Sequence, residues 1–428
     1  MKTVQPKNEA RPSLLKQINC ARLLDLLRVN SGMTRAELAR HTGLMRSTVS
    51  EIIKDLMNEG LILSEELTTH SRSGRKGEGL ILNPEGAFFI GASIAGEHLT
   101  VVKANLTKEP LVTIRRRIGS DKTPETVLNT LVELIKDLCS ADSLSSQKLR
   151  GIGVAVQGTL NLNGVAIRCP FLKWENVDLR HYLEPPLKAY INDQSKLIID
   201  NDANAAALAE MYINSTIRNN SLLYVLINQG MGAGLVINHR LWRGFNGTAG
   251  EPGSLILNPS SLSNALTSEP KTLNDVVGGV GLLRRYRELG GKSENLETLI
   301  RTLPEDFKQN EPKAKKVVEE WTEFLGSGLI ALVNILNPEF LVLGGPVSNL
   351  MLNLPNVKDR LHEILRDHVL GNGEDGFFLA GDDITDSNKN RFYLSQYADV
   401  AAAMGGAMLA YHSLFEIPDL EMLRRGRL

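Results

Sequence analysis

The spacing of apolar residues in the first sixty positions predicts three short helices. Apolar side chains recur there every three or four residues, which is the period of an amphipathic helix. The first helix is expected over 18–29 with a start near Gln17, after a polar stretch, 1–16, that contains two prolines and is expected to be disordered. A second, short helix should end at His41, and a third should cover 45–59. The chain therefore opens with a small helical unit.

The junction between the second and third helices has the spacing of a helix-turn-helix. Thr34 and Glu37 form a capping box, in which the hydroxyl and the carboxylate bind each other's free backbone N–H groups. Ala39 is small where two helices would cross, Gly43 suits the turn, and Val49 would lie under the third helix. This spacing is typical of DNA-binding helix pairs. The alternative is a small helical bundle with a solvated basic face.

Polar and basic side chains gather on the opposite face of the third helix, where they would reach base edges and phosphates from the major groove. Two positions at the start of the second helix are added to this face. The candidate DNA-contacting residues are Thr34, Arg35, Arg46, Ser47, Thr48, Ser50 and Lys54. Two apolar strands, 61–63 and 80–82, then bracket a basic loop. Such strands form a wing suited to the phosphate backbone or the minor groove, and its candidate residues are Arg72, Arg75 and Lys76. The segment 17–82 is therefore predicted to be a winged helix-turn-helix DNA-binding domain.

After the turn at 83–86 the pattern changes to strands and then to α/β units. The first half is predicted to contain strands 88–95, 98–105 and 111–118, a helix over 124–139 and a strand over 151–156, followed by Trp174 and a proline-broken loop. The second half repeats this order, with strands 221–228 and 232–238, helices over 272–289 and 313–336, strand 340–343 and a closing helix over 398–412. Two lobes of similar order imply a cleft between them. One lobe is expected over about 88–200 plus the C-terminal helix, and the other over about 201–395.

The stretch 197–210 is predicted to be a buried strand that leads directly into an alanine-rich helix, with Asn201 and Asp202 at the join. Ligands of α/β sheets bind just beyond the carboxyl ends of strands. This amide and carboxylate are therefore candidates to hold a polyhydroxylated molecule. The alternative is that they only cap the helix, a role for which Asn and Asp are preferred.

Charge and cysteine content narrow the class of protein. The chain of 428 residues has 48 basic and 49 acidic residues, yet 1–82 holds 13 Lys and Arg against 9 Asp and Glu, which favours an anionic partner for this part. The three cysteines form no CxxC pair, which argues against a disulfide framework and a clustered zinc site. No apolar run approaches the ~18 residues of a membrane span, and the N-terminus lacks the apolar core of a signal peptide. We therefore expect a soluble, cytoplasmic protein with no membrane partner.

Glycine-rich turns, and the order of several motifs, indicate a family. The turns at 151–153, 230–234 and 344–345 follow predicted strands, but none is a P-loop and no GxGxxG is present. Together with the runs NDANAAALAE, WRGFNGTAGEPGS and NPEFLVLGGP, they resemble the ROK family of repressors and sugar kinases over 88–428. The N-terminal 82 residues look like the winged helix of ROK repressors, such as those of the N-acetylglucosamine and xylose type, which the kinases lack. The resemblance implies a two-lobed α/β fold of the actin-like ATPase (ribonuclease H-like) class.

The same resemblance argues against kinase activity. In the kinases an Asp-x-Gly-Gly-Thr turn on the first strand holds the phosphates of ATP, but the matching run 93–97 is Ser-Ile-Ala-Gly-Glu. The carboxylate that would manage Mg²⁺ is absent, and Glu97 is expected to repel a triphosphate. The second phosphate turn, Gly-Thr-Gly in the kinases, is Asn-Gln-Gly at 228–230. We therefore expect no catalytic residue and no ATP cofactor.

The sugar-binding motifs of the family are better kept. Asn201 and Asp202 match its sugar-contacting pair, and Asp202 stands where a kinase has its base. Glu251 matches the second sugar-binding carboxylate, Ser254 stands in place of a His ligand, and Gly158 completes the candidate sugar site. That His and three cysteines expected shortly after it are zinc ligands in the family. Because all four are absent, no metal is expected.

Taken together, the sequence predicts a DNA-binding transcriptional regulator, a repressor of carbohydrate uptake or catabolism genes that is released by a sugar or sugar derivative in the cleft. It would bind a pseudo-palindromic double-stranded DNA operator as a homodimer or tetramer. Two alternatives stay open: an ATP-dependent sugar kinase with a DNA-binding domain, and a DNA-binding regulator controlled by a protein partner, with a vestigial cleft. Phe171, where the family often has Asn, and Ser254 keep the last alternative open, because both depart from the family's sugar site.

Overall fold

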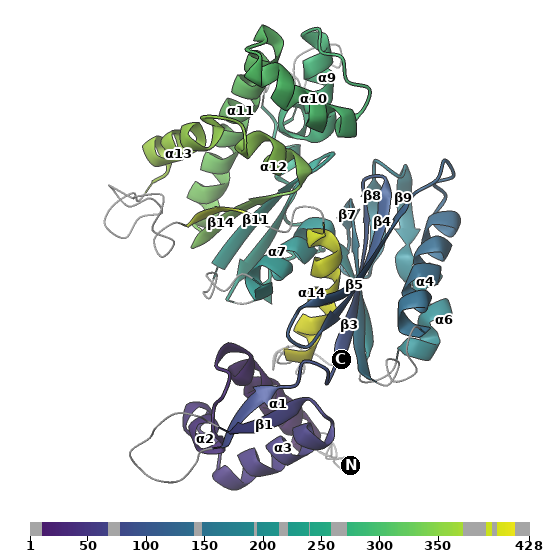
Figure 1. The fold of residues 1–428 in the computed structure, drawn as a ribbon, viewed down its shortest axis with the longest axis vertical. Helices are drawn as coiled ribbons and strands as arrows, with labels where there is room; N and C mark the ends of the chain where they lie inside the picture. Colours follow the sequence, from purple (N-terminus) through teal and green to yellow (C-terminus); the bar gives the residue numbers. More distant parts are fainter. Residues whose placement is uncertain are drawn as a thin grey trace, which may run out of the picture.

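The computed structural model describes residues 11–66, 78–140, 148–191, 195–213, 221–238, 240–257, 272–370, 391–395 and 400–415. A small N-terminal unit precedes two five-stranded sheets, and two helices, α7 (Asp202–Ile213) and α14 (Ala401–Phe415), lie between the sheets (Figure 1). This is the predicted fold class, two α/β lobes preceded by a winged helix. Within the described ranges, every helix is too short or too polar to cross a lipid bilayer.

The N-terminal unit is a winged helix. It contains α1 (Arg11–Val29), α2 (Arg35–Thr42) and α3 (Arg46–Asn58), followed by β1 (Ile62–Glu66) and β2 (Glu78–Leu82), which pair antiparallel. The predicted helix start near Gln17 was wrong, because α1 begins at Arg11. Proline is tolerated in the first turn of a helix, so Pro12 does not exclude one. Lys16 fastens this early part of α1 to α3 through an ion pair with Asp55 at 2.6 Å.

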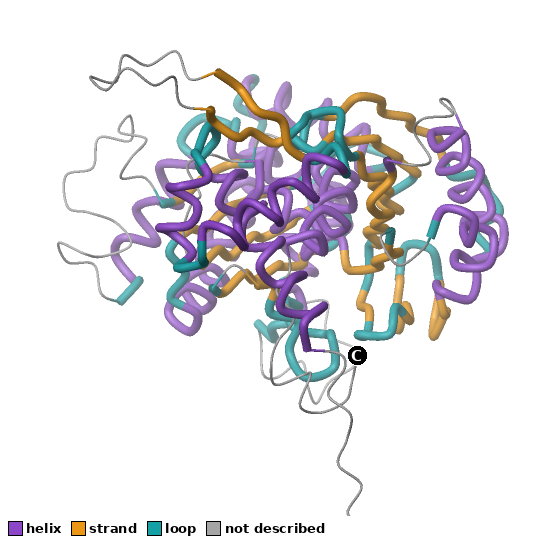
Figure 2. The backbone as a smooth tube through the Cα atoms, turned by 90° about the horizontal axis from the view of Figure 1, so that it is seen from below, coloured by secondary structure: helices purple, strands orange, loops and turns teal. Residues whose placement is uncertain are grey.

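The first large sheet has the strand order β10-β6-β3-β4-β5. Its strands are β3 (Phe88–Ala95), β4 (His98–Asn105), β5 (Pro110–Arg117), β6 (Leu149–Val156) and β10 (Lys196–Asn201). Both faces of β3 are buried, because Ile90 and Ile94 pack toward α4 (Pro124–Ser140) while Phe89 packs toward α14. Helices therefore cover both faces of the sheet, as Figures 1 and 2 show. The predicted strands and helix of this half are confirmed.

The segment that follows Trp174 was predicted as a proline-broken loop, and this was wrong, because it holds the rest of a strand and a helix; the strands before Trp174 were not predicted. The stretch after β6 contains a three-stranded antiparallel sheet of β7 (Thr159–Leu160), β8 (Val165–Cys169) and β9 (Trp174–Asp178), and then α6 (Leu179–Leu187). Asp178 caps α6 by accepting bonds from two free backbone N–H groups. The two prolines lie only in the last turn of α6, so most of the helix forms before they remove a donor.

The second large sheet has the order β13-β12-β11-β14-β15. Its strands are β11 (Ser221–Ile227), β12 (Met231–Ile237), β13 (Arg240–Leu241), β14 (Phe340–Gly344) and β15 (Phe392–Leu394). The helices packed with it include α8 (Asn274–Val277), α9 (Gly279–Glu288), α10 (Leu296–Lys308), α11 (Pro312–Leu336), α12 (Pro346–Leu352) and α13 (Val357–His368). The single helix predicted over 272–289 is two helices, because Gly278 between them is extended, and α10 was not predicted.

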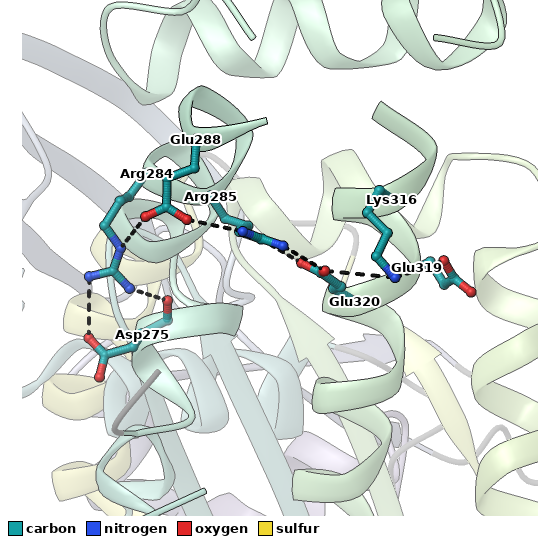
Figure 3. A network of polar contacts seen from close by, with 7 residues as sticks. All are labelled: Asp275, Arg284, Arg285, Glu288, Lys316, Glu319 and Glu320. Atoms are coloured by element: carbon teal, nitrogen blue, oxygen red, sulfur yellow. Dashed lines mark hydrogen bonds and ion pairs between the residues drawn. The ribbon is translucent and has the colours of Figure 1, made fainter. Parts of the chain in front are cut away.

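An ion-pair network ties α9 to α11 (Figure 3). The guanidinium of Arg285 donates to both carboxylate oxygens of Glu320, at 2.8 and 2.9 Å, and also to Glu288 at 3.2 Å. Hydrogen bonds from Arg285 lower the pKa of Glu320. The network lies on the far side of the second sheet from α7 and holds the helical layer together.

Small side chains let α7 and α14 pack closely. All but the last residue of α7 are buried, and five of these eleven residues are alanines. A Cβ added at Gly405 of α14 would lie 2.4 Å from the backbone of Ala205, and one added at Gly406 would lie 2.7 Å from the carbonyl oxygen of Gly153. Only glycine fits at either position without movement of the backbone. In this way α14, from the end of the chain, joins the cores of both sheets.

Candidate functional site

The helix-turn-helix geometry follows directly from three residues. The Thr34 hydroxyl accepts the Glu37 N–H at 3.3 Å, and the Glu37 carboxylate accepts the Thr34 N–H at 2.8 Å. The bonds that this carboxylate accepts from the Thr34 N–H and the Thr34 hydroxyl lower the pKa of Glu37. Gly43 has φ of 71°, a left-handed conformation that favours glycine, and its N–H donates to the last turn of α2. The predicted capping box and turn are confirmed.

The third helix, α3, is divided into a buried and an exposed face. Its apolar residues Val49, Ile52, Ile53 and Leu56 lie in the core. Of the predicted DNA-contacting residues, Arg46, Ser47, Ser50 and Lys54 are exposed and Thr48 is half-buried. These five side chains therefore belong to the polar surface of α3, which is where a major-groove contact would be made.

The other predicted DNA-contacting positions lie elsewhere. The Thr34 hydroxyl is used in the capping box, and the Arg35 guanidinium donates to Glu78 at 2.7 Å. This ion pair fastens α2 to strand β2 of the wing, and the bond from Arg35 lowers the pKa of Glu78. In the structure, Thr34 and Arg35 thus shape the domain. The wing residues Arg72, Arg75 and Lys76 lie in 67–77, outside the described residues.

The candidate sugar site lies where β10 ends and α7 begins. Asn201 caps α7, because its side-chain oxygen accepts the N–H groups of Ala203 at 2.8 Å and Asn204 at 3.2 Å. Its side-chain nitrogen donates to the carbonyl oxygen of Gly158 at 2.6 Å. The capping interpretation is therefore confirmed for Asn201, and its amide is oriented from both sides. The structure brings Asn201, Asp202 and Gly158 together.

Two carboxyl groups, those of Asp202 and Glu251, give this site its electrostatics. Asp202 is 5% exposed, and burial raises its pKa to about 7. The hydrogen bond from the Ala203 N–H acts in the opposite direction and lowers this pKa, whereas the charge of Glu251 raises it further. Burial also raises the pKa of Glu251. The Thr159 hydroxyl donates a hydrogen bond to the Glu251 carboxylate at 2.8 Å, and this bond lowers the pKa. Ser254, in the short helix η2 (Pro252–Ser254), is exposed, and its N–H donates to the Glu251 carbonyl at 3.1 Å. A pair of carboxyls of this kind is a ready acceptor for sugar hydroxyl groups.

The segment 242–251, which follows β13, is bound to the first lobe. Besides the Thr159–Glu251 bond, Arg243 forms an ion pair with the buried Asp200 at 2.7 Å. The carbonyl of Asn246 accepts the N–H of Leu162 at 3.3 Å. We did not predict Asp200 or Arg243 as site residues. A carboxylate at the end of a buried strand was the available signal for the first, but nothing in the sequence pairs it with an arginine 43 positions later.

The far end of α7 contacts the winged helix. The Arg28 guanidinium of α1 lies 5.0 Å from the centre of the Tyr212 ring, and Tyr212 also bonds His412 of α14 through its hydroxyl. Lys108 donates to the Tyr212 carbonyl at 2.9 Å, and burial lowers the pKa of Lys108. These contacts, which we call the Tyr212 junction, place one helix between the candidate sugar site and the DNA-binding unit. Sequence analysis did not predict them.

The two turns that would hold nucleotide phosphates in a kinase are engaged internally. The Gly96 N–H donates to the side-chain oxygen of Gln157 at 2.8 Å. Glu97 is paired with Arg117 of β5, so its charge is balanced. The prediction that Glu97 would repel a triphosphate is therefore corrected, because the positive charge of Arg117 offsets the charge of the carboxylate. The second turn is tied to α9, because the carbonyls of Asn228 and Gln229 accept backbone N–H groups there.

The aromatic residues of these segments differ in burial. Trp174 is 3% exposed, and its indole N–H donates to the Lys122 carbonyl at 2.6 Å, so it belongs to the core. The ammonium of Lys122 lies 3.7 Å from the centre of the Phe171 ring, which covers one face of that ring. Trp242 is 57% exposed. In the part of the chain that the structure describes, no cluster of three His, Cys, Asp or Glu side chains could hold a metal ion.

Comparison with known proteins decides the family. Residues 90–412 match the ROK family, and residues 22–62 match a winged helix-turn-helix DNA-binding model. The chain belongs to the ROK family. It is 27% identical to a xylose repressor of Caldicellulosiruptor bescii over 78% of this chain and 85% of the repressor, and 27% identical to a glucokinase of Halalkalibacterium halodurans over 61% of this chain and 81% of the kinase.

Comparison with solved structures agrees with this family assignment. A solved structure described as a ROK family transcriptional regulator, a homologue of the Escherichia coli MLC protein, matches 94% of this ROK chain and 97% of its own, with a TM-score of 0.73 and 21% identity. The match therefore includes the winged helix as well as both lobes. The ROK fold predicted from the sequence is confirmed.

Proposed function

We propose that this ROK protein is a transcriptional repressor that binds a DNA operator through α3 and the wing and is released when a sugar or sugar derivative binds beside Asp202 and Glu251. The observation that carries the proposal is the polar face of α3, on a winged helix that is packed directly on the sugar-kinase-like lobes. The similarity to a xylose repressor over most of both chains supports it. We further propose a cytoplasmic homodimer or tetramer, because two-fold symmetry lets two winged helices meet the two half-sites of an operator.

The route from sugar to DNA would run along α7. Its first turn is capped by Asn201, and the next residue, Asp202, is one of the two site carboxyls. Its last turn carries Tyr212, which contacts Arg28 of the winged helix. A sugar that binds closed and open lobes with different affinity would move α7, and with it the Tyr212 junction. The spacing of paired winged helices would then no longer match the operator.

We propose that the chain has no kinase activity and needs neither ATP nor zinc. Gly96 stands in the turn that holds ATP phosphates in ROK kinases, and its N–H is occupied by Gln157. A phosphate would have to displace this bond. Asp202 would then serve only to form hydrogen bonds with sugar hydroxyl groups. The kinase alternative is tested by ATP-dependent phosphorylation of xylose, glucose and amino sugars, and product that disappears in Asp202→Asn would establish it.

The DNA part is tested with Arg46→Ala. A duplex is first recovered from a randomised library by in vitro selection on the wild-type protein, and its affinity is measured by fluorescence anisotropy. Loss of an arginine from the reading face is expected to weaken binding roughly 5- to 150-fold. Arg366→Ala, on the exposed side of α13, is the control and should bind as wild type. Equal affinity of Arg46→Ala and wild type would contradict the placement of the interface.

The sugar part is tested by a thermal-shift panel of sugars, amino sugars and their phosphates. The best ligand should release the selected duplex from the wild type but not from Glu251→Ala, because the substitution removes an acceptor at the site. Glu175→Ala, an exposed carboxylate of β9, serves as the control and should respond normally. If no sugar shifts the melting temperature while DNA binding is intact, the alternative of control by a protein partner is favoured.

A further inference from the structure

One apolar residue lies at the start of the DNA-facing helix without a structural role that the fold explains. Met45 is the N-cap of α3, and its side chain forms no capping hydrogen bond. Ser, Thr, Asp and Asn are the residues that cap helices well, because their oxygen accepts a free backbone N–H. Met45 is also 77% exposed, more than any other large apolar side chain in the described part of the winged helix. Positions that break local rules without a packing gain are often functional.

The position of Met45 indicates what it would contact. It directly precedes Arg46 and Ser47, which are exposed on the polar face of α3, whereas Leu44 before it is half-buried against the core. The N-terminal residues of a recognition helix are the ones that meet base edges in the major groove. An apolar side chain at this point cannot read a hydrogen-bonding edge.

The major groove presents one apolar group, the C5 methyl of thymine. Building on the proposed operator binding, we propose that Met45 reads a thymine in each half-site by contact with this methyl group. The flexible thioether chain can follow the groove floor and cover the methyl group, while Arg46 and Ser47 contact polar edges or phosphates beside it. Met45 is thus assigned as a specificity-determining residue for DNA.

The test removes the methyl group from the DNA and the thioether from the protein. In the duplex selected on the wild type, each thymine is replaced singly by deoxyuridine, which differs only in lacking the C5 methyl. One thymine in each half-site should show roughly fourfold weaker binding when replaced, which corresponds to about 0.8 kcal/mol for one buried methyl-sized group. The other thymines should show no change.

The protein variant is Met45→Ser, which deletes the apolar contact but supplies a good cap. It should bind the selected duplex more weakly than wild type, and deoxyuridine at the sensitive position should cause no further loss, as expected of two groups in contact. Hydrogen exchange in the first turn of α3 should be equal or slower than in wild type, which shows that the helix is intact. Leu15→Ser, at an exposed apolar position of α1, should keep the wild-type affinity and the fourfold effect.

The outcomes separate the two proposals. If selection recovers a duplex but no deoxyuridine substitution weakens binding, or if the fourfold effect persists in Met45→Ser, Met45 does not read a thymine. In the first of these cases its exposure points to a protein contact instead. If selection recovers no specific duplex at all, the proposed repressor function fails, and the assignment of Met45 fails with it.

Discussion

Replacement of Tyr212 tests whether α7 carries the signal from the sugar site to the winged helix. Tyr212→Leu removes the ring that stacks with Arg28 and the hydroxyl that bonds His412, whereas Tyr212→Phe removes only the hydroxyl. The Arg28 side chain is 19% exposed, so its contact with the ring is worth about 1–2 kcal/mol. The hydrogen bond contributes about 1 kcal/mol.

These contact energies are as large as the coupling free energy expected between the sugar site and the DNA-binding unit. Allosteric coupling free energies are about 1–3 kcal/mol, which is roughly a 5- to 150-fold change in affinity. Loss of the stack should therefore remove most of the release in Tyr212→Leu, while Tyr212→Phe should keep the larger part of it. Sugar affinity should stay close to that of the wild type in both, because the substitutions lie at the opposite end of α7 from Asp202.

The assay measures the dissociation constant of the selected duplex with and without saturating sugar, and the dissociation constant of the sugar by calorimetry with and without DNA. The factor by which sugar weakens DNA binding must equal the factor by which DNA weakens sugar binding, since coupling between two binding sites is reciprocal. Tyr286→Phe, which removes a buried hydroxyl bonded to Asp306 in the second lobe, is the control and should keep the wild-type ratio. A Tyr212→Leu protein that folds, binds both ligands and retains the full ratio would refute the route along α7.

Three further predictions concern stability. Because burial raises the pKa of Asp202 to about 7, the folded protein keeps this proton between about pH 4 and 7 after the unfolded chain has lost it. Stability should thus fall as the pH rises through this range, by at most about 4 kcal/mol, and urea titrations of Asp202→Asn at pH 5 and 8 should show a smaller fall. Arg285→Ala should cost about 1 kcal/mol in urea unfolding, since Glu320 loses a two-pronged but partly exposed partner. This cost should shrink in high salt, because salt screens the ion pair, and a cost that stays the same in high salt would contradict its ionic origin. Gly406→Ala should lower the melting temperature by several degrees, because its Cβ would press on the Gly153 carbonyl; an unchanged value would mean that α14 can shift without cost.

Local chemistry allowed the helix-turn-helix and the strand-to-helix join at 201–202 to be predicted. The capping box of Thr34 and Glu37 acts within three residues, and the glycine turn at Gly43 acts within one. Such features do not depend on the rest of the fold.

The predicted helix bounds were wrong where the helix contacts residues that are distant in the sequence or is capped by a residue outside it. The part of α1 that precedes its apolar period is paired with α3 through Lys16 and Asp55, and Asp178 caps α6 ahead of its prolines. Periodicity contains no record of either partner. The family resemblance identified Glu251, but only the structure showed that Thr159 from the other lobe bonds to it.

The sequence by itself determined the class of each domain, because capping, periodicity and motif order are encoded within short stretches. Tertiary structure alone decided how the sites are connected. The contact between Arg28 and Tyr212 joins residues 184 positions apart, and the ion pair of Asp200 with Arg243 crosses from one lobe to the other. Such pairs exist only because two sheets, a shared helix layer and the winged helix pack together, and no local pattern specifies which charged or aromatic side chains will meet there.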